Sequence, residues 1–128
     1  MPHRPTLAVM RSHHFSAILT ASETLCAWQQ ADFLAVMKAA VSLAQLTPVG
    51  ELAVTFHPQG ISAVLLLEES HLALHFWPEN QKVSIDIHVC DYHYENQEKA
   101  KLLADILTLK MSHNHQKEQW NYLLTTDQ

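Results

Sequence analysis

The sequence has 128 residues, with eight basic and thirteen acidic side chains and a formal net charge of -5. This length fits one compact domain, and the lack of a Lys/Arg cluster excludes a surface built to neutralise phosphates, so we expect no nucleic-acid partner. Hydrophobic residues make up 48% and charged residues 16%, a composition that favours self-association through apolar surface.

The first half of the chain predicts a strand followed by a long helix. Residues 13–20 partly alternate between apolar and polar, as a half-buried strand does. Ser22 offers an N-cap, and apolar residues recur at helical spacing as far as about Leu46, which predicts a helix with a break near Gln30. The helix is expected to stop at residues 47–50, which contain a proline and a glycine.

The second half predicts several short strands and a second helix. Four apolar or alternating segments are separated by turn residues, which indicates an antiparallel sheet: 51–56, 61–67, 72–77 and 83–90. Spacings of three and four then predict a helix from Tyr94 or Glu95 to about Met111, and the polar tail 112–128 contains a candidate last strand. The expected fold is α+β, a two-layer sandwich with an antiparallel sheet and helices packed on one face, in a single domain 1–128.

Four side chains suited to acid-base and nucleophilic chemistry fall near the ends or middles of these adjacent predicted strands. Ser62 and Ser70 supply hydroxyls, His75 a base, and Cys90 a thiol. Antiparallel pairing brings distant positions of a chain together, so the four are candidates for one site. Each alone has an ordinary structural interpretation: a strand or turn hydroxyl for the serines and a small buried residue for the cysteine.

The segment from Phe56 to Cys90 resembles the bacterial and archaeal S-adenosylmethionine decarboxylase proenzymes. The resemblance is dense over residues 54–90 and loose elsewhere. It is carried by Phe56-His57-Pro58-Gln59-Gly60-Ile61-Ser62, Glu69-Ser70-His71, His75-Phe76-Trp77-Pro78-Glu79, Asp86 and Cys90. Three positions depart from the family's usual pattern: Ala63 and Asp91, where the family has glycine, and Phe76, where it has threonine.

The resemblance implies a chain that cleaves itself. In the family the serine hydroxyl, here that of Ser70, attacks the carbonyl of the residue before it, Glu69, and the resulting ester is opened by β-elimination and hydrolysis. The products are a β chain 1–69 and an α chain 70–128 whose first residue has become a covalent pyruvoyl group. His75 falls at the position of the base that removes the serine α-proton, and Ser62 at that of a hydroxyl that supports processing.

The resemblance also implies the reaction, which is decarboxylation of S-adenosylmethionine to the aminopropyl donor of spermidine synthesis. The pyruvoyl ketone forms a Schiff base with the substrate amine and accepts the electrons released with carbon dioxide. Cys90 stands at the position of the proton donor, Phe56 at that of an aromatic residue stacked on adenine, and Trp77 and Glu79 at substrate-pocket positions. The family builds its sites between two protomers, so we expect a homodimer of processed αβ protomers.

Two alternatives remain open at this stage. The first is a pyruvoyl-dependent decarboxylase of the same lineage that acts on arginine or ornithine. The second is an unprocessed paralogue that serves as a binding or regulatory subunit, and such a protein would remain one chain despite Ser70.

We expect a cytoplasmic protein with free thiols and no metal centre. No apolar run reaches the roughly 20 residues that span a bilayer, and residues 1–11 lack a signal-peptide core. Cys26 and Cys90 lie far apart in a chain without a secretory signal, which argues against a disulfide. The ten histidines show no spacing typical of a zinc site, although the pair His113 and His115 is close enough for adventitious binding.

Overall fold

The computed structural model describes residues 9–91, 94–112 and 119–128. Its strands all belong to one sheet, and its helices separate β1 from β2 and β5 from β6. In chain order the elements are β1 (Arg11–Thr20), the 3-10 helix η1 (Glu23–Ala27), α1 (Gln30–Leu43), β2 (Pro48–Thr55), β3 (Ile61–Leu67), β4 (Ser70–Trp77), β5 (Lys82–Cys90), α2 (Gln97–Ser112) and β6 (Asn121–Thr126).

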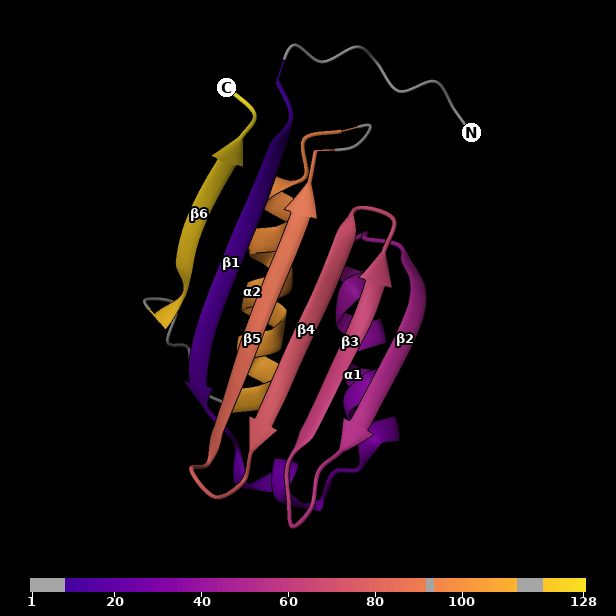
Figure 1. Ribbon diagram of the computed structural model, residues 1–128, viewed down its shortest axis with the longest axis vertical. Coiled ribbons are helices and arrows are strands. Elements are labelled where there is room, and N and C mark those ends of the chain that lie inside the picture. The colour runs from indigo at the N-terminus through magenta and orange to yellow at the C-terminus, as the bar shows by residue number, and fades with distance from the viewer. Residues whose placement is uncertain (1–8, 92–93, 113–118) are drawn as a thin grey trace.

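The six strands run antiparallel in the order β2-β3-β4-β5-β1-β6. Both α-helices lie behind the same face of this sheet, α1 over its β2–β3 side and α2 over its β5–β1 side (Figure 1). The predicted two-layer α+β sandwich is therefore confirmed, and the C-terminal segment is a true edge strand.

The helical region divides where the sequence predicts a break. η1 ends at Ala27, and α1 begins again at Gln30 with a capping box in which the backbone N–H of Gln29 donates to the Asp32 carboxylate at 2.8 Å. The end of α1 differs from the prediction. The chain turns at Gln45, whose φ is 63°, and Pro48 already begins β2, an edge strand in which its missing N–H is tolerated.

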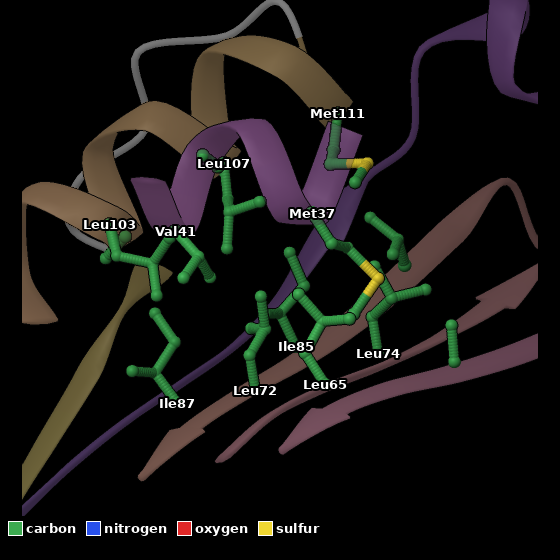
Figure 2. Close-up of a cluster of buried hydrophobic side chains, with 14 of the residues drawn as sticks. Met37, Val41, Leu65, Leu72, Leu74, Ile85, Ile87, Leu103, Leu107 and Met111 are labelled. Atoms are coloured by element: carbon green, nitrogen blue, oxygen red, sulfur yellow. The ribbon is translucent and has the colours of Figure 1, made fainter. Parts of the chain in front are cut away.

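The hydrophobic core lies between the helices and one face of the sheet (Figure 2). Met37 and Val41 of α1 point down toward the sheet, as do three side chains of α2. Alternate residues of the central strands pack against these helix side chains. The side chains from both layers are at most 4% exposed: Leu65, Leu72, Leu74, Ile85 and Ile87 from the strands, and Leu103, Leu107 and Met111 from α2. Burial on this scale fixes the register of each strand, because a slip of one residue would turn its apolar side chains out of the core.

The opposite side of the sheet, here called the open face, is covered by no helix of the described residues (Figure 1). The residues between the core positions of each strand point to this side. Several are large, apolar and more than 40% exposed: Ile18, Leu52, Val54, Leu66, Trp77 and Leu123. The same face carries the polar and titratable side chains from which a site must be built.

β6 is held against β1 by a buried chain of hydrogen bonds. His13 is 4% exposed; its Nε2 lies 2.9 Å from the Asp91 carboxylate and its Nδ1 2.7 Å from the Tyr122 hydroxyl. Burial, and secondarily the charge of Asp91, raise the pKa of Tyr122, which keeps the phenol protonated and able to donate. Asp91 thus has a structural role at this position, where the resembling family has glycine.

Replacing Tyr122 with phenylalanine is expected to lower the free energy of unfolding by about 1–2 kcal/mol, because the buried Nδ1 of His13 loses its partner. Urea unfolding of the two proteins measures the difference. The matched control is Tyr94→Phe, at a tyrosine that is 72% exposed and far from β6 in the sequence. Equal stability of Tyr122→Phe and the parent protein would show that this hydrogen bond contributes nothing.

Candidate active site

The Glu69–Ser70 peptide lies at the tight turn between β3 and β4. Ser70 has a φ of 150°, a conformation that a residue with a side chain seldom adopts. The carbonyl oxygen of Glu69 accepts a hydrogen bond from the backbone N–H of Cys90 at 2.8 Å. The Glu69 carboxylate is anchored in the other direction, by the N–H of Thr47 at 3.0 Å and its hydroxyl at 3.3 Å. Both the carbonyl group and the side chain of Glu69 are therefore held in place.

Cys90 and His71 complete the surroundings of Ser70. The Ser70 hydroxyl lies 3.2 Å from Nδ1 of His71, and Val89, the neighbour of Cys90, is the cross-strand partner of Ser70. Cys90 is a partly buried cysteine that forms no disulfide, and it lies beside a hollow of about 250 Å³ between β5, β1 and β6. The sequence prediction that Ser70 and Cys90 belong to one site is consistent with this geometry.

Ser62 and His75 form a second cluster further along the sheet. They are directly opposite each other in β3 and β4, and the Ser62 hydroxyl shares a hydrogen bond of 2.5 Å with Nδ1 of His75. The imidazole is stacked between two aromatic rings, with centroid distances of 5.5 Å to Phe56 and 3.9 Å to Trp77. Gly60, with a φ of 108°, passes close by, and a Cβ there would lie 3.9 Å from Nε2 of His75.

This second cluster borders a groove of about 290 Å³ in the open face. Its walls include Leu52, Val54, Val64 and Asp86 as well as Ser62 and His75. Phe56 and Trp77 are 42% and 41% exposed, so each retains area for contact with another molecule. Glu79 is exposed in the β4–β5 turn.

The two clusters are far apart within one chain. Ser70 and His75 are five residues apart on the same strand, which at about 3.4 Å per residue separates them by roughly 17 Å. A side chain does not span that distance. The structure thus gathers Ser70, His71 and Cys90 at one end of the sheet and Ser62, His75, Phe56 and Trp77 toward the other, and it does not unite them.

Phe76 does not reach either cluster. Its side chain is 3% exposed on the helix side of the sheet and packs against Phe33 of α1, with ring centroids 5.6 Å apart. The departure from the family's usual threonine at this position is therefore a change in the core, and it leaves the groove unaltered.

A row of three histidines crosses the open face beside Ser70. His14, His88 and His71 are cross-strand partners on β1, β5 and β4. The rings of His14 and His88 are stacked at 5.1 Å, and those of His88 and His71 meet edge to face at 5.2 Å. Burial lowers the pKa of His88, and the charges of His71 and His14 lower it further. Sequence patterns alone do not reveal this row, because it depends on strand register.

The lowered pKa of His88 makes the fold sensitive to acid. The unfolded chain, in which the histidine has its ordinary pKa near 6.5, binds the proton more readily than the folded chain does. The corresponding stability is complete above about pH 7 and is lost as the pH falls through 6.5. His88→Gln is therefore expected to show a smaller drop in Tm between pH 7.5 and 5.5 than the parent, while His57→Gln, in the β2–β3 loop, shows the parent's drop. Equal drops for the parent and His88→Gln would contradict this linkage.

Within residues 9–91, 94–112 and 119–128, no group of three or more His, Cys, Asp or Glu side chains is arranged to hold a metal ion. His113 and His115 lie outside these ranges. In the same described part of the chain, no helix is long and apolar enough to cross a membrane.

Comparison with known proteins places this arrangement in a family. The family model described as S-adenosylmethionine decarboxylase matches residues 19–118. The chain belongs to the S-adenosylmethionine decarboxylase family. Its matched region includes every candidate residue of both clusters, and the resemblance seen in the sequence is thereby confirmed.

Individual members of the S-adenosylmethionine decarboxylase family match over shorter segments. Proteins named S-adenosylmethionine decarboxylase proenzyme from Symbiobacterium thermophilum and Clostridium botulinum are 46% and 38% identical over 57 and 55 residues. These alignments cover 44% and 43% of this chain, and 43% and 47% of the relatives, so the chain spans about half the length of the curated relatives it matches.

A solved structure, that of the adenosylmethionine decarboxylase from Aquifex aeolicus, shares the fold. It superposes with a TM-score of 0.71 at 20% sequence identity and covers 93% of this chain and 91% of its own. At that identity the likeness establishes the architecture, including the sheet with both helices on one face, and carries no further conclusion about individual side chains.

Proposed function

We propose that this protein is a self-processing, pyruvoyl-dependent S-adenosylmethionine decarboxylase, which releases carbon dioxide and the decarboxylated aminopropyl donor. The observation that carries the proposal is the state of the Glu69–Ser70 peptide. Ser70 combines a nucleophilic hydroxyl with a strained φ, and the carbonyl it would attack already accepts a hydrogen bond from Cys90. Family membership supports the same assignment.

The geometry favours attack of Ser70 on its own peptide bond. Negative charge develops on the Glu69 carbonyl oxygen during the attack, and the Cys90 N–H is directed at that atom at 2.8 Å. Residues in sparsely populated φ/ψ regions cost about 1–3 kcal/mol, and cleavage of the peptide releases that strain. The anchored Glu69 side chain keeps the carbonyl in place while the serine moves.

The residues around Ser70 suit the group that would replace it. A pyruvoyl group made from Ser70 would begin β4, next to His71 and close to the backbone of Cys90, and it would supply the electron sink that decarboxylation requires. In this proposal the Cys90 thiol returns a proton to the substrate carbon. Cys90 also lines a hollow of about 250 Å³ whose other walls include residues of β1, β5 and β6.

We further propose that the active site is completed by a second copy of the chain, packed open face to open face. Most homodimers are isologous, with a two-fold axis that places each surface against itself. An axis crossing the strands midway between the two clusters brings the partner's Ser62–His75 pair opposite Ser70. The exposed apolar residues of the open face support this packing, since a face of this kind is usually covered.

Within that dimer the substrate lies between the two clusters. Phe56 provides an exposed aromatic face for adenine, and Trp77 lines the same region. Glu79 has a carboxylate able to accept both ribose hydroxyls, and its charge favours a sulfonium cation nearby. These three roles follow the family resemblance and make S-adenosylmethionine the substrate of choice over arginine or ornithine.

The experiment that tests the proposal measures carbon dioxide release from carboxyl-labelled S-adenosylmethionine, arginine and ornithine in parallel. Release from S-adenosylmethionine alone supports it, and release from arginine or ornithine alone replaces it with the corresponding decarboxylase. Phe56→Ala is expected to lose turnover of S-adenosylmethionine while still cleaving itself, whereas Tyr94→Ala, at an exposed aromatic residue outside the groove, retains both. No release from any of the three by a chain that stays whole would instead favour a binding or regulatory subunit.

A further inference from the structure

Self-cleavage begins with a serine hydroxyl, which is a weak nucleophile until a base takes its proton. The described part of the chain places one imidazole within hydrogen-bond distance of the Ser70 hydroxyl, that of His71, with Nδ1 at 3.2 Å. His75, which family resemblance assigns to a later proton transfer, is on the same strand but roughly 17 Å away. The first proton transfer therefore has a candidate base of its own.

We propose that His71 is the general base of the acyl shift and that it acts on Ser70 of its own chain. The inference rests on the proposed self-processing function and adds a residue to it. An imidazole is well suited to the task because its ordinary pKa lies near the pH at which the chain must cleave. His71 is only partly buried, so its ring has room to turn during the step.

The step balances within three groups. Nδ1 of His71 takes the proton from the Ser70 hydroxyl as the oxygen forms a bond to the carbonyl carbon of Glu69, whose oxygen is held by the Cys90 N–H. A five-membered ring results, with the negative charge on the former carbonyl oxygen. The carbon–nitrogen bond then breaks, the electron pair goes to nitrogen, and the protonated His71 returns its proton there. The product is an ester with a free amine, and no outside reactant is consumed.

His71 belongs to the row of histidines on the open face. The edge of its ring meets the His88 ring on β5, and His14 of β1 stacks on His88 in turn. On its other side the cross-strand partner is the apolar Leu66 of β3. The titratable groups on the surrounding open face are His88, Asp86 and Cys90 of β5, His14 of β1 and His75 of β4.

The test separates ester formation from the later steps. The parent chain, His71→Asn and His75→Ala are made in a cell-free system, and their masses are followed with time with and without neutral hydroxylamine, which cuts an ester and spares an amide. His75→Ala is expected to accumulate an ester that hydroxylamine cleaves at Glu69. His71→Asn, which keeps a hydrogen-bond acceptor near Ser70 but no base, is expected to remain an uncut amide, with ester formation slowed at least about 100-fold.

Two controls separate chemistry from folding. His14→Asn changes a histidine of the same row that is not in contact with Ser70, and it is expected to cleave at the parent's rate. His71→Ala is expected to regain cleavage when imidazole is added, which a merely structural role for the ring would not permit. In addition, ester formation in His75→Ala should be slower at pH 5.5 than at pH 7.5, because an imidazole acts as a base only in its neutral form.

Several outcomes overturn the inference and leave the proposed function standing. They are ester formation in His71→Asn at a rate within a factor of three of the parent, and a rate of ester formation in His75→Ala that stays flat between pH 5.5 and 7.5. The proposed function fails separately, if the parent chain remains whole and cannot be cut by hydroxylamine. The pH profile uses no change at His71, so the inference remains testable even if both His71 variants fail to fold.

Discussion

Replacing Ser70 with alanine is expected to leave the chain in one piece and to reduce decarboxylation of S-adenosylmethionine to background. The alanine has no hydroxyl to attack the Glu69 carbonyl, so neither the ester nor the pyruvoyl group forms. Turnover is lost together with the pyruvoyl group. When carbon dioxide leaves, the electron pair of the broken bond stays on the substrate carbon, and the remaining side chains offer no electron sink for it. The effect is therefore all or none, unlike that of a residue that only positions the substrate.

The measurement is the denatured mass of the purified protein, with a carbonyl-trapping reagent in a parallel sample. The parent should give two fragments, the larger ending at Glu69, and the other should carry a ketone that the reagent traps. Ser16→Ala is the matched control, since Ser16 is a serine of the open face on β1 and is expected to cleave normally. Two fragments from the Ser70→Ala protein would place the cleavage elsewhere and end the proposed mechanism.

The strained backbone at Ser70 gives a reason why the proposed cleavage would be confined to one peptide bond. The hydroxyl of any serine lies close to the carbonyl before it, yet Ser70 is the one serine of the described residues with a positive φ. At Ser70 the chain leaves a tight turn with a φ of 150°, and the carbonyl is fixed by Cys90 from a third segment. Local sequence and long-range pairing thus act together on a single peptide bond.

Sequence patterns predict the layers of this fold well, because the spacing of apolar residues shows which side of each strand or helix is buried. The strands around Leu65, Leu72 and Ile85 carry apolar residues at every second position, and α1 and α2 carry them at every third and fourth. The same reasoning placed the break near Gln30. It misplaced the end of α1, because a glutamine at position 45 adopts the left-handed conformation that the sequence suggested for a glycine further on.

The candidate site is harder to predict from the sequence, since it depends on which residues of neighbouring strands lie opposite each other. Motif resemblance drew together Ser70, His75 and Cys90, but the spacing of the first two along one strand already puts them roughly 17 Å apart. The role of the Cys90 backbone and the row of His14, His88 and His71 follow only from register. The proposal that a second chain completes the site rests instead on the exposed apolar residues of the open face.

Replacing His75 with alanine is expected to stop the chain from completing its cleavage, with the rate of the proton-transfer step reduced by about 100-fold to 10,000-fold. Because His75 is beyond reach of Ser70 in its own chain, the structure predicts that this loss can be repaired from outside. The repair requires a partner whose His75 is intact and whose own cleavage is blocked. Ser70→Ala meets both conditions.

Co-expression of His75→Ala and Ser70→Ala chains, distinguished by tags of different mass, therefore provides the decisive measurement. Each variant is expected to remain uncleaved when it is expressed alone. In a mixed dimer, Ser70 of the first chain faces His75 of the second, so about half of the His75→Ala chains should be cleaved if the two assort at random. A His71→Asn chain mixed with Ser70→Ala should stay whole, because its missing base belongs to the same chain as its serine. If His75→Ala chains also stay whole in the mixture, His75 acts within its own chain, and the open faces do not meet as proposed.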